Sequence, residues 1–204
     1  MRRVPLSHRS HVTGFNAVPT GMTEHESALE RDFVTLSSFA DRDAKITSQP
    51  ITIRFEHDGD RRRYTPDFLV EWSDGRSELV EVKYRADLRA GWKRFRPAFA
   101  AGRRWIRERG GSFRIATDRT VRCPALDAAK RLLPLRSATL DPDLAKTTLA
   151  MVRTLRDPTF QELANAMPAA REEALGVIWR MIAQGMLRID VSAPIVPATR
   201  IGLP

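Results

Sequence analysis

The fold is decided by residues 64–84, which read YTPDFLVEWSDGRSELVEVKY. Two runs rich in aromatic and β-branched residues flank Ser73-Asp74-Gly75, a sequence typical of a hairpin loop. Alternate residues of a strand point to the same face, so Glu81 and Lys83 project together, opposite to Val82. Burying charges on an otherwise apolar strand is costly, and this pair therefore indicates a functional site.

The register of this hairpin follows from the length of its loop. Gly75 suits the left-handed position of a three-residue loop, and such a loop places Asp67 directly opposite Glu81. A two-residue loop would instead pair Asp67 with Val82 and send the two carboxylates to opposite faces. The three-residue register is predicted, because it is the one that brings the carboxylates together.

Asp67, Glu81 and Lys83 have complementary chemistry. Two carboxylates offer oxygen ligands to a hard divalent cation, and an adjacent lysine can act on a bound water, as phosphodiester hydrolysis requires. The alternative is a half-exposed hairpin whose charged residues face water. The apolar runs beside both carboxylates argue against it, and so does Lys83, since only five of the 34 basic residues are lysine. The pKa of lysine can be tuned, whereas arginine stays protonated.

Composition limits the class of protein. A chain of 204 residues has room for one mid-sized core and a small appended domain. Neither a membrane span nor a signal peptide is predicted, because no apolar run is long enough. The single Cys123 excludes an internal disulfide and is typical of a cytosolic protein, and the four scattered histidines lack the spacing of a zinc site.

The net charge of +9 is concentrated in one segment. Residues 85–136 carry 15 basic and four acidic residues, whereas residues 1–84 have a net charge of −2 and residues 137–204 a net charge of zero. A polyanion such as DNA is the expected partner, because phosphate contacts release counterions. The alternative is an arginine-rich, solvated helix. The candidate DNA-binding residues are Arg89, Lys93, Arg94, Arg96, Arg103, Arg104 and Arg107.

The predicted elements follow the order helix, three strands, helix, strand. Residues 1–22 are expected to form an arm, and a capping box of Thr23 and Glu26 opens a helix that reaches about Ala40. A basic helix over about 87–109 contains Pro97, which should kink it. The strands are predicted over 51–57, 64–72, 78–84 and 112–117, with a last helix over 124–133. This order predicts an α/β domain over 23–136, with a mixed sheet flanked by helices.

Residues 137–204 have a different pattern, for which helices over 144–155, 160–167 and 169–184 and a strand over 186–191 are predicted. Three helices and a strand suggest a winged helix-turn-helix. Its recognition helix would open with Glu172 and Glu173, which repel phosphates. A protein-contact module is therefore favoured over a reader of DNA sequence, and the tail 194–204 is expected to help meet the partner.

Five spaced segments resemble the TnsA endonuclease family, part of the PD-(D/E)xK superfamily. They are RSHVTG at 9–14, ESALERDF at 26–33, QP at 49–50, YTPDF at 64–68 and EVK at 81–83. The resemblance covers residues 9 to about 120. It implies a restriction-endonuclease-like α/β fold over 23–136, followed by a small winged-helix-like domain over 137–204.

The resemblance also implies a catalytic site. Asp67, Glu81 and the backbone carbonyl of Val82 would hold one or two Mg²⁺ ions, for which Mn²⁺ could substitute. Lys83 would orient or deprotonate the attacking water and offset charge on the pentacovalent phosphate. By its place in the ESALE motif, Glu30 would complete the site, although an ordinary helix-surface glutamate is the alternative.

Gln49 is an accessory candidate, which would either approach this site or simply lead the chain into a strand. Its position directly before Pro50 carries the resemblance, but no charge or spacing assigns it a chemical role.

The implied function is that of an endonuclease subunit of a heteromeric transposase. It would cut double-stranded DNA at the 5′ ends of a transposon, while a separate DDE transposase cuts and joins the 3′ ends. The C-terminal domain would dock onto that transposase or onto an AAA+ ATPase regulator, in the bacterial cytoplasm at the nucleoid. Two other classes stay open, namely a stand-alone nuclease of defence or repair and a non-catalytic DNA-binding assembly factor.

Overall fold

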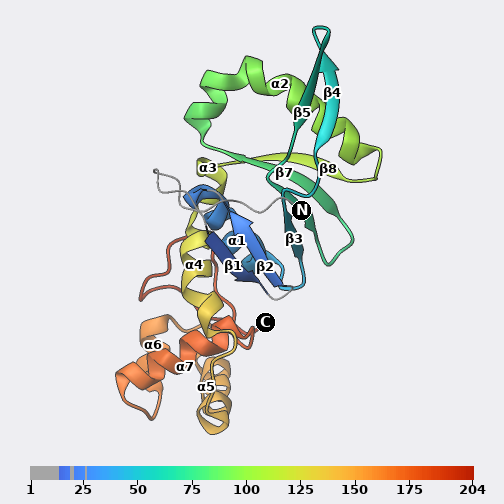
Figure 1. The fold of residues 1–204 in the computed structure, drawn as a ribbon. Coiled ribbons are helices and arrows are strands. Elements are labelled where there is room, and N and C mark those ends of the chain that lie inside the picture. The colour runs from blue at the N-terminus through green and yellow to red at the C-terminus, as the bar shows by residue number, and fades with distance from the viewer. Residues whose placement is uncertain (1–13, 19–20, 26) are drawn as a thin grey trace. The chain divides into compact units, whose positions relative to one another are not determined.

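The computed structural model describes residues 14–18, 21–25 and 27–204 (Figure 1). The chain divides into two compact units, Met1–Arg122 and Cys123–Pro204. The predicted boundary after residue 136 lies further along the chain than this division. The difference arises because helix α4 (Pro124–Leu132) contacts helix α7 (Arg171–Ala183) and so belongs with the second unit.

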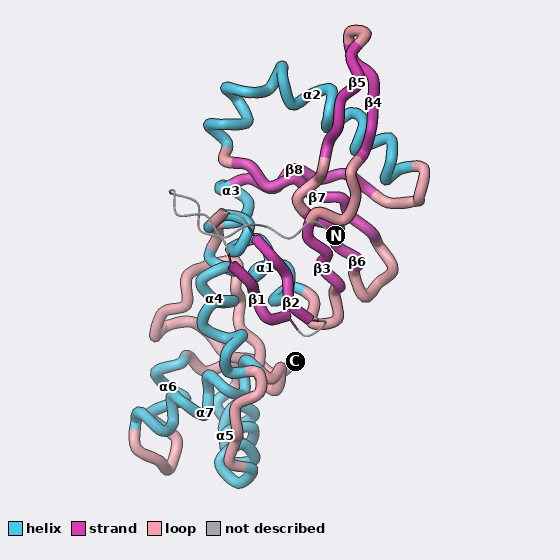
Figure 2. Tube along the Cα trace, in the orientation of Figure 1, coloured by secondary structure: helices cyan, strands magenta, loops and turns pink. Residues whose placement is uncertain are grey.

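The first unit is built on a four-stranded mixed sheet with the strand order β3-β6-β7-β8 (Figure 2). Its strands are β3 (Lys45–Ser48), β6 (Phe68–Glu71), β7 (Ser77–Lys83) and β8 (Ser112–Thr117). Strand β6 is antiparallel to β3 and β7, whereas β7 and β8 are parallel. The parallel pair is joined by a helical crossover, α2 (Arg85–Arg107), as parallel pairing requires. The predicted mixed sheet flanked by helices is confirmed.

The predicted strand 51–57 does not join this sheet. It forms β4 (Ile53–His57), which pairs with β5 (Asp60–Tyr64) in a separate two-stranded hairpin. Asp58 and Gly59 at its tip have φ angles of 53° and 80°, as a two-residue type I′ turn requires. The first strand of the sheet is instead β3, which was not predicted. Apolar alternation identifies a strand but not the strand it pairs with.

The hairpin of β6 and β7 has the predicted register. Phe68 pairs with Val80, and the next position along the ladder places Asp67 opposite Glu81. Gly75 in the loop has a φ of 86°, a left-handed conformation that glycine adopts at little cost. The three-residue loop therefore sets the pairing that the site requires.

Helices α1 (Ala28–Ala40) and α2 cover opposite faces of the sheet (Figure 1). On one face, Val82 packs in a core with Leu29 of α1. On the other face, Leu79 packs in a second core with Phe99 of α2. Alternate residues of β7 thus enter different cores, and Glu81 shares the α2 face with Leu79. The predicted division of this strand into two faces is confirmed.

The N-terminal segment differs from the prediction. Strands β1 (Gly14–Val18) and β2 (Gly21–His25) pair antiparallel, so this part of the predicted arm is a hairpin. A helix start at Thr23 is wrong because Thr23 lies in β2, while Glu26 and residues 1–13 lie outside the described residues. Helix α1 begins after Ser27, whose Oγ accepts a hydrogen bond from the Glu30 amide at 3.2 Å. The same capping pattern occurs there, four residues later.

The basic helix α2 is one continuous element although it contains Pro97. It ends shortly before Gly110, whose φ of 77° is typical of a residue that follows a helix. Strand β8 and the short helix α3 (Asp118–Val121) complete the first unit. In the part of the chain that the structure describes, no helix is both long and apolar enough to cross a membrane.

The second unit is helical. Gly185 has a φ of 75°, and the amide of Met186 donates to the carbonyl of Met181 at 2.9 Å, which closes α7 with a Schellman motif as the glycine predicted. Thr159 and Glu162 form a capping box that opens α6. Besides α4 and α7, the unit contains α5 (Pro142–Leu155), α6 (Phe160–Ala166) and a 3₁₀ turn (Leu133–Leu135).

The predicted strand over 186–191 does not form in this unit, all of whose residues are described. Arg188 makes only an isolated bridge to Gly202. The tail 194–204, predicted to meet a partner, instead folds back on its own unit, where Ile201 is fully buried. Prolines in the tail lack the N–H that a ladder needs, which accounts for bridges in place of strands. A winged-helix architecture stays a prediction.

Candidate active site

The carboxylate of Asp67 is fixed to the end of the sheet by the main chain of the neighbouring strand. Its Oδ2 accepts a hydrogen bond from the backbone amide of Val82 at 2.7 Å. Asp67 itself precedes β6, and its own carbonyl accepts a hydrogen bond from the amide of Gln49 at 2.8 Å. The residue is therefore held from both sides, by β7 and by the end of β3.

Lys83 brings the predicted site residues together. Its Nζ lies 3.0 Å from Oε1 of Glu81 and 3.8 Å from Oδ2 of Asp67. It also lies 3.4 Å from the carbonyl oxygen of Val82. These three oxygens are the ones that the sequence assigned to a metal, and all of them lie within 4 Å of one cationic atom. The predicted convergence of Asp67, Glu81 and Lys83 is present in the structure.

The electrostatics of the cluster follow from its burial. Burial raises the pKa of the Asp67 carboxyl well above its usual range, and the neighbouring charge of Glu81 raises it further, against the opposing effect of Lys83. Burial by itself would lower the pKa of Lys83, but the charges of Asp67 and Glu81 outweigh it, so the pKa lies above its ordinary value. Lys83 is therefore an ammonium in this structure.

Tyr64 is a site residue that the sequence analysis missed. Its hydroxyl donates a hydrogen bond to Oε2 of Glu81 at 2.7 Å, and both residues are buried. Burial and the charge of Glu81 raise the pKa of Tyr64, so the phenol stays protonated and can only donate here. Glu81 thus has one oxygen fixed by Tyr64 and the other by Lys83. The signal was available, because Tyr64 opens the YTPDF segment, but its strand partner was not known.

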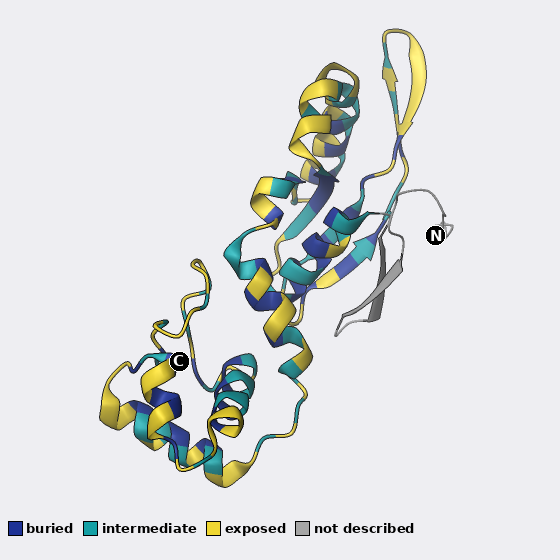
Figure 3. Ribbon diagram, turned by 90° about the vertical axis from the view of Figure 1, so that its left-hand side faces the viewer, coloured by how far each residue is buried: buried dark blue, intermediate teal, exposed yellow. Residues whose placement is uncertain are grey.

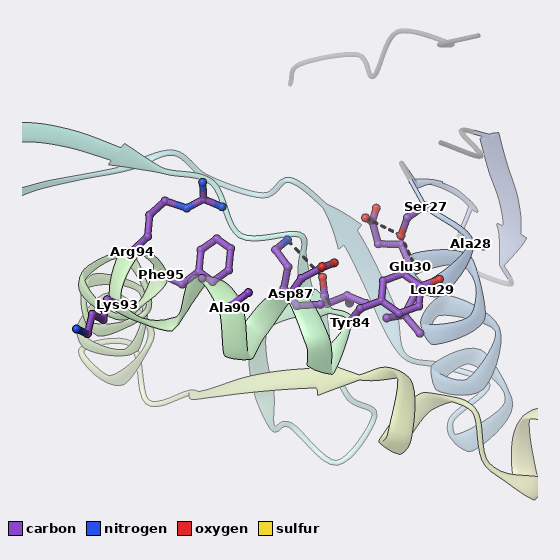
Figure 4. Close-up of a pocket in the computed structure, with 13 residues that line it drawn as sticks. Ser27, Ala28, Leu29, Glu30, Tyr84, Asp87, Ala90, Lys93, Arg94 and Phe95 are labelled. Carbon is purple, nitrogen blue, oxygen red and sulfur yellow. Dashed lines mark hydrogen bonds between the residues drawn. The ribbon is translucent and has the colours of Figure 1, made fainter. Parts of the chain in front are cut away.

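Glu30 faces a hollow beside this cluster (Figure 4). The hollow has a volume of about 920 Å³, and Glu30 and Lys83 both line it. Oγ of Ser27 donates to the Glu30 carboxylate at 3.1 Å, and the charge of Glu30 contributes to the raised pKa of Asp67. Glu30 therefore acts on the cluster electrostatically. Asp87, at the start of α2, also lines the hollow and was not singled out from the sequence.

Gln49 contacts the site through its backbone. Its φ is 44°, an uncommon left-handed conformation for a residue other than glycine, and its amide donates to the carbonyl of Asp67. This bond extends the pairing of β3 with β6 by one position. Of the two roles predicted for Gln49, the structure shows one at the end of a strand that also supports Asp67.

The oxygens of the cluster fit a hard divalent cation. Among the described residues, no group of three or more His, Cys, Asp or Glu side chains could hold a metal ion, so Glu30 does not join Asp67 and Glu81 in such a group. Two carboxylates and the Val82 carbonyl nevertheless surround the positive charge of Lys83. They are the oxygen ligands that Mg²⁺ accepts, and water can complete its coordination.

The predicted DNA-binding residues are all exposed on α2. At 100° per residue, six of the seven fall within an arc of about 100° on the helix. Arg94 is the exception, and it lines the hollow beside Glu30 together with Lys93. The two side chains leave the helix in different directions (Figure 4). The remaining five, which do not line the hollow, are Arg89, Arg96, Arg103, Arg104 and Arg107.

The fold and the site together define a class of protein. A mixed sheet flanked by helices, with Asp67 opposite Glu81 and Lys83 one strand pleat further on, is the arrangement of a PD-(D/E)xK nuclease of the restriction-endonuclease-like fold. The aspartate, the glutamate and the lysine of that motif are the residues that the structure brings together.

Comparison with protein families agrees with this class. Residues 44–118 match the family model described as TnsA-like endonuclease N terminal. The chain therefore carries a TnsA-type endonuclease domain, which supports a nuclease role in transposition with DNA as the substrate and a Tn7-type transposase partnership. Comparison with curated proteins finds no match. The matched segment includes Asp67, Glu81 and Lys83 but ends before the second unit.

Proposed function

We propose that this protein is a Mg²⁺-dependent DNA endonuclease subunit of a heteromeric transposase, which hydrolyses phosphodiester bonds at the 5′ ends of a transposon. The observation that carries the proposal is the convergence of Asp67 and Glu81 on Lys83 within a TnsA-like domain. The charged cluster is buried and lines a hollow, so it is not a solvated surface pair.

Asp67, Glu81 and the carbonyl of Val82 would hold the metal. When bound, Mg²⁺ supplies a Lewis acid for the phosphate and lowers the pKa of a coordinated water. The protein keeps the ligand oxygens in place beforehand: the Val82 amide fixes Asp67, and the Tyr64 hydroxyl fixes Glu81. Such outer partners orient the ligands and tune their affinity for the metal.

Lys83 contributes a positive charge next to the scissile phosphate. Since Asp67 and Glu81 raise its pKa, it serves as a hydrogen-bond donor to the attacking water or to a phosphate oxygen rather than as the base that removes a proton. An ammonium held in a partly buried site stabilises the negative charge that develops on the phosphate. Of the two roles that the family resemblance implies for Lys83, the raised pKa favours orientation and charge stabilisation.

The substrate would approach through the hollow beside Glu30. Lys93 and Arg94 line this hollow, so two cations are available for phosphates that flank the cut. Glu30 would assist the site through its charge and through water, since among the described residues it is not grouped with the other two carboxylates. The exposed arginines further along α2 would hold the DNA backbone without regard to sequence.

The second unit would recruit the nuclease to its partners, a DDE transposase and an AAA+ ATPase regulator. Glu172 and Glu173 are exposed in the first turn of α7, where they would repel phosphates. A half-buried Trp179 lies beside a small hollow on the same unit, flanked by Arg131 and Arg171. These features favour protein contact over DNA reading.

The test of this proposal is cleavage of transposon-end DNA in the assembled system, with Asp67→Ala and Lys83→Ala compared with wild type. Each variant should lose Mg²⁺-dependent strand cleavage and keep DNA affinity nearly intact, because neither residue is on the exposed basic face. Asp74→Ala is the matched control, since Asp74 is an exposed carboxylate in the loop of the same hairpin, paired with Arg76.

The outcomes separate the proposal from its alternatives. Cleavage by Asp67→Ala at the wild-type rate would leave a non-catalytic assembly factor. Cleavage of generic DNA by the wild-type chain without any partner would instead favour a stand-alone nuclease. Loss of cleavage in both variants with retained binding, and full activity in the control, is the result that we expect.

A further inference from the structure

The hairpin of β4 and β5 carries an arginine-rich face that the proposed site does not use. It forms a two-stranded sheet of its own, and its far end is exposed (Figure 3). Directly opposite residues share one face of an antiparallel pair, so Ile53 and Phe55 lie on the inner face, which packs against α2. The outer face presents Arg54, Glu56, Arg61 and Arg63.

Arg54 and Arg63 stand directly opposite each other on this outer face. Cross-strand neighbours have Cβ atoms about 4.5–5.5 Å apart, and like charges at this distance destabilise a hairpin. Neither residue makes an ion pair within the described part of the chain. Arg61, by contrast, lies 3.8 Å from Glu56. A repulsive pair at the base of a hairpin calls for an anion from outside the protein.

The position of this pair relates it to the active site. Strand β5 runs from Arg63 directly into Tyr64, whose hydroxyl contacts Glu81, and Asp67 follows four residues after Arg63. Four extended residues span at most about 14 Å. At about 3.4 Å per base pair this corresponds to roughly four base pairs of DNA. A duplex held at Asp67 therefore passes within reach of Arg54 and Arg63.

The tip of the hairpin limits how DNA could lie. Asp58 and Asp60 are exposed there, and Asp60 pairs with Arg62 at 3.5 Å. Two carboxylates at the tip oppose insertion into a groove, so the contact would be made by the outer face near the base of the hairpin. The tight Asp58-Gly59 turn keeps this face flat and preformed.

We propose that the outer face of the β4–β5 hairpin, through Arg54 and Arg63, is a second DNA-binding surface, which grips the phosphate backbone of the duplex a few base pairs from the cut. The inference rests on the proposed function, because it takes DNA as the substrate. It adds a surface separate from the basic face of α2. Phosphate binding also explains why a repulsive arginine pair is kept at this place.

The test compares full-length wild type with Arg54→Thr/Arg63→Thr in binding to a labelled duplex of mixed sequence. If each arginine contacts one phosphate, the salt slope should fall by about 1.8, and affinity near 0.1 M salt should fall by at most about 60-fold. Threonine favours strands and pairs well across them, so the melting temperature should stay at or above the wild-type value. A lysine pair in place of the arginines should restore most of the affinity.

Arg62→Thr is the matched control. Arg62 lies one position from Arg63 but on the other face, opposite Phe55, and it pairs with Asp60. The substitution removes the same charge from the same strand and should leave the salt slope of DNA binding nearly unchanged. The expected result is a reduced slope in Arg63→Thr and a wild-type slope in Arg62→Thr.

Two results would overturn the inference. Equal reductions in Arg62→Thr and Arg63→Thr would mean that only the overall charge matters. Wild-type affinity and slope in the double variant would show that the hairpin does not contact DNA, and the proposed nuclease function would then still stand. A wild-type chain that neither binds nor cuts DNA would instead remove the proposed function itself.

Discussion

Removing one hydroxyl group from Tyr64 should alter how the site responds to metal. In the structure this hydroxyl donates a 2.7 Å hydrogen bond to Glu81, and the two residues are 8% and 5% exposed. Tyr64→Phe keeps the ring in its core with Phe99 and removes only this bond. It leaves one oxygen of a buried carboxylate without the donor that fixes it.

The magnitude follows from the charge and burial of the pair. A hydrogen bond to a charged group contributes about 1.5–3 kcal/mol, and one whose removal leaves a buried partner unsatisfied falls at the upper end. At about 2–4 °C per kcal/mol, the melting temperature should fall by roughly 3–12 °C. A partner that orients a metal ligand affects metal affinity or activity by about 10–100-fold. The Mg²⁺ concentration for half-maximal cleavage should rise within that range.

The assay is a Mg²⁺ titration of strand cleavage in the assembled system, alongside thermal denaturation. Tyr64→Phe should approach the wild-type rate at high Mg²⁺, because the ligand oxygens remain and only their orientation is relaxed. Thr65→Ala is the control, since it removes a neighbouring hydroxyl that lies 2.9 Å from the hydroxyl of Thr52 in an exposed position. Its Mg²⁺ midpoint should match that of wild type.

An unchanged midpoint in Tyr64→Phe would refute the reasoning, because Glu81 would then be oriented without Tyr64. A lower rate that no Mg²⁺ concentration restores, together with a large decrease in stability, would also refute it. That result would assign Tyr64 to the core alone.

Two further predictions concern surfaces away from the metal ligands. Changing Arg103, Arg104 and Arg107 to alanine should weaken binding to any duplex and flatten the salt dependence by close to one unit for each phosphate that is no longer bound, whereas an unchanged slope in a salt titration would mean that this face is only solvated. A chain ending after residue 122, where the compact units divide, should bind generic duplex DNA within a few fold of the full chain but fail to cleave in the assembled system; a large decrease in DNA affinity in a binding titration would show that the second unit binds DNA.

Local sequence determined the parts of this protein that depend on near neighbours. The glycine of a three-residue loop has the φ of 86° that was expected, and this loop fixes the pairing that places Asp67 opposite Glu81. Alternation within β7 correctly divided its residues between two faces, because the side-chain period of a strand is two. The Asp67, Glu81 and Lys83 cluster could therefore be predicted without a structure.

Signals of similar strength that competed along the chain could not be resolved. Ser27 with Glu30 and Thr23 with Glu26 have the same capping pattern, and the second lies partly in strand β2. A strand predicted over 186–191 found no ladder to join within the fully described second unit. Propensity identifies candidate elements, whereas packing against the rest of the chain selects among them.

Only the tertiary structure decided which distant residues meet. Tyr64 reaches Glu81 because β5 leads from a separate hairpin into the site, and no spacing in the sequence reveals that contact. The same fold places Arg54 opposite Arg63 and makes Lys83 the cation of a buried cluster, which fixes its charge. Burial and through-space charge depend on the assembled core, and they turn a hairpin motif into a site with defined chemistry.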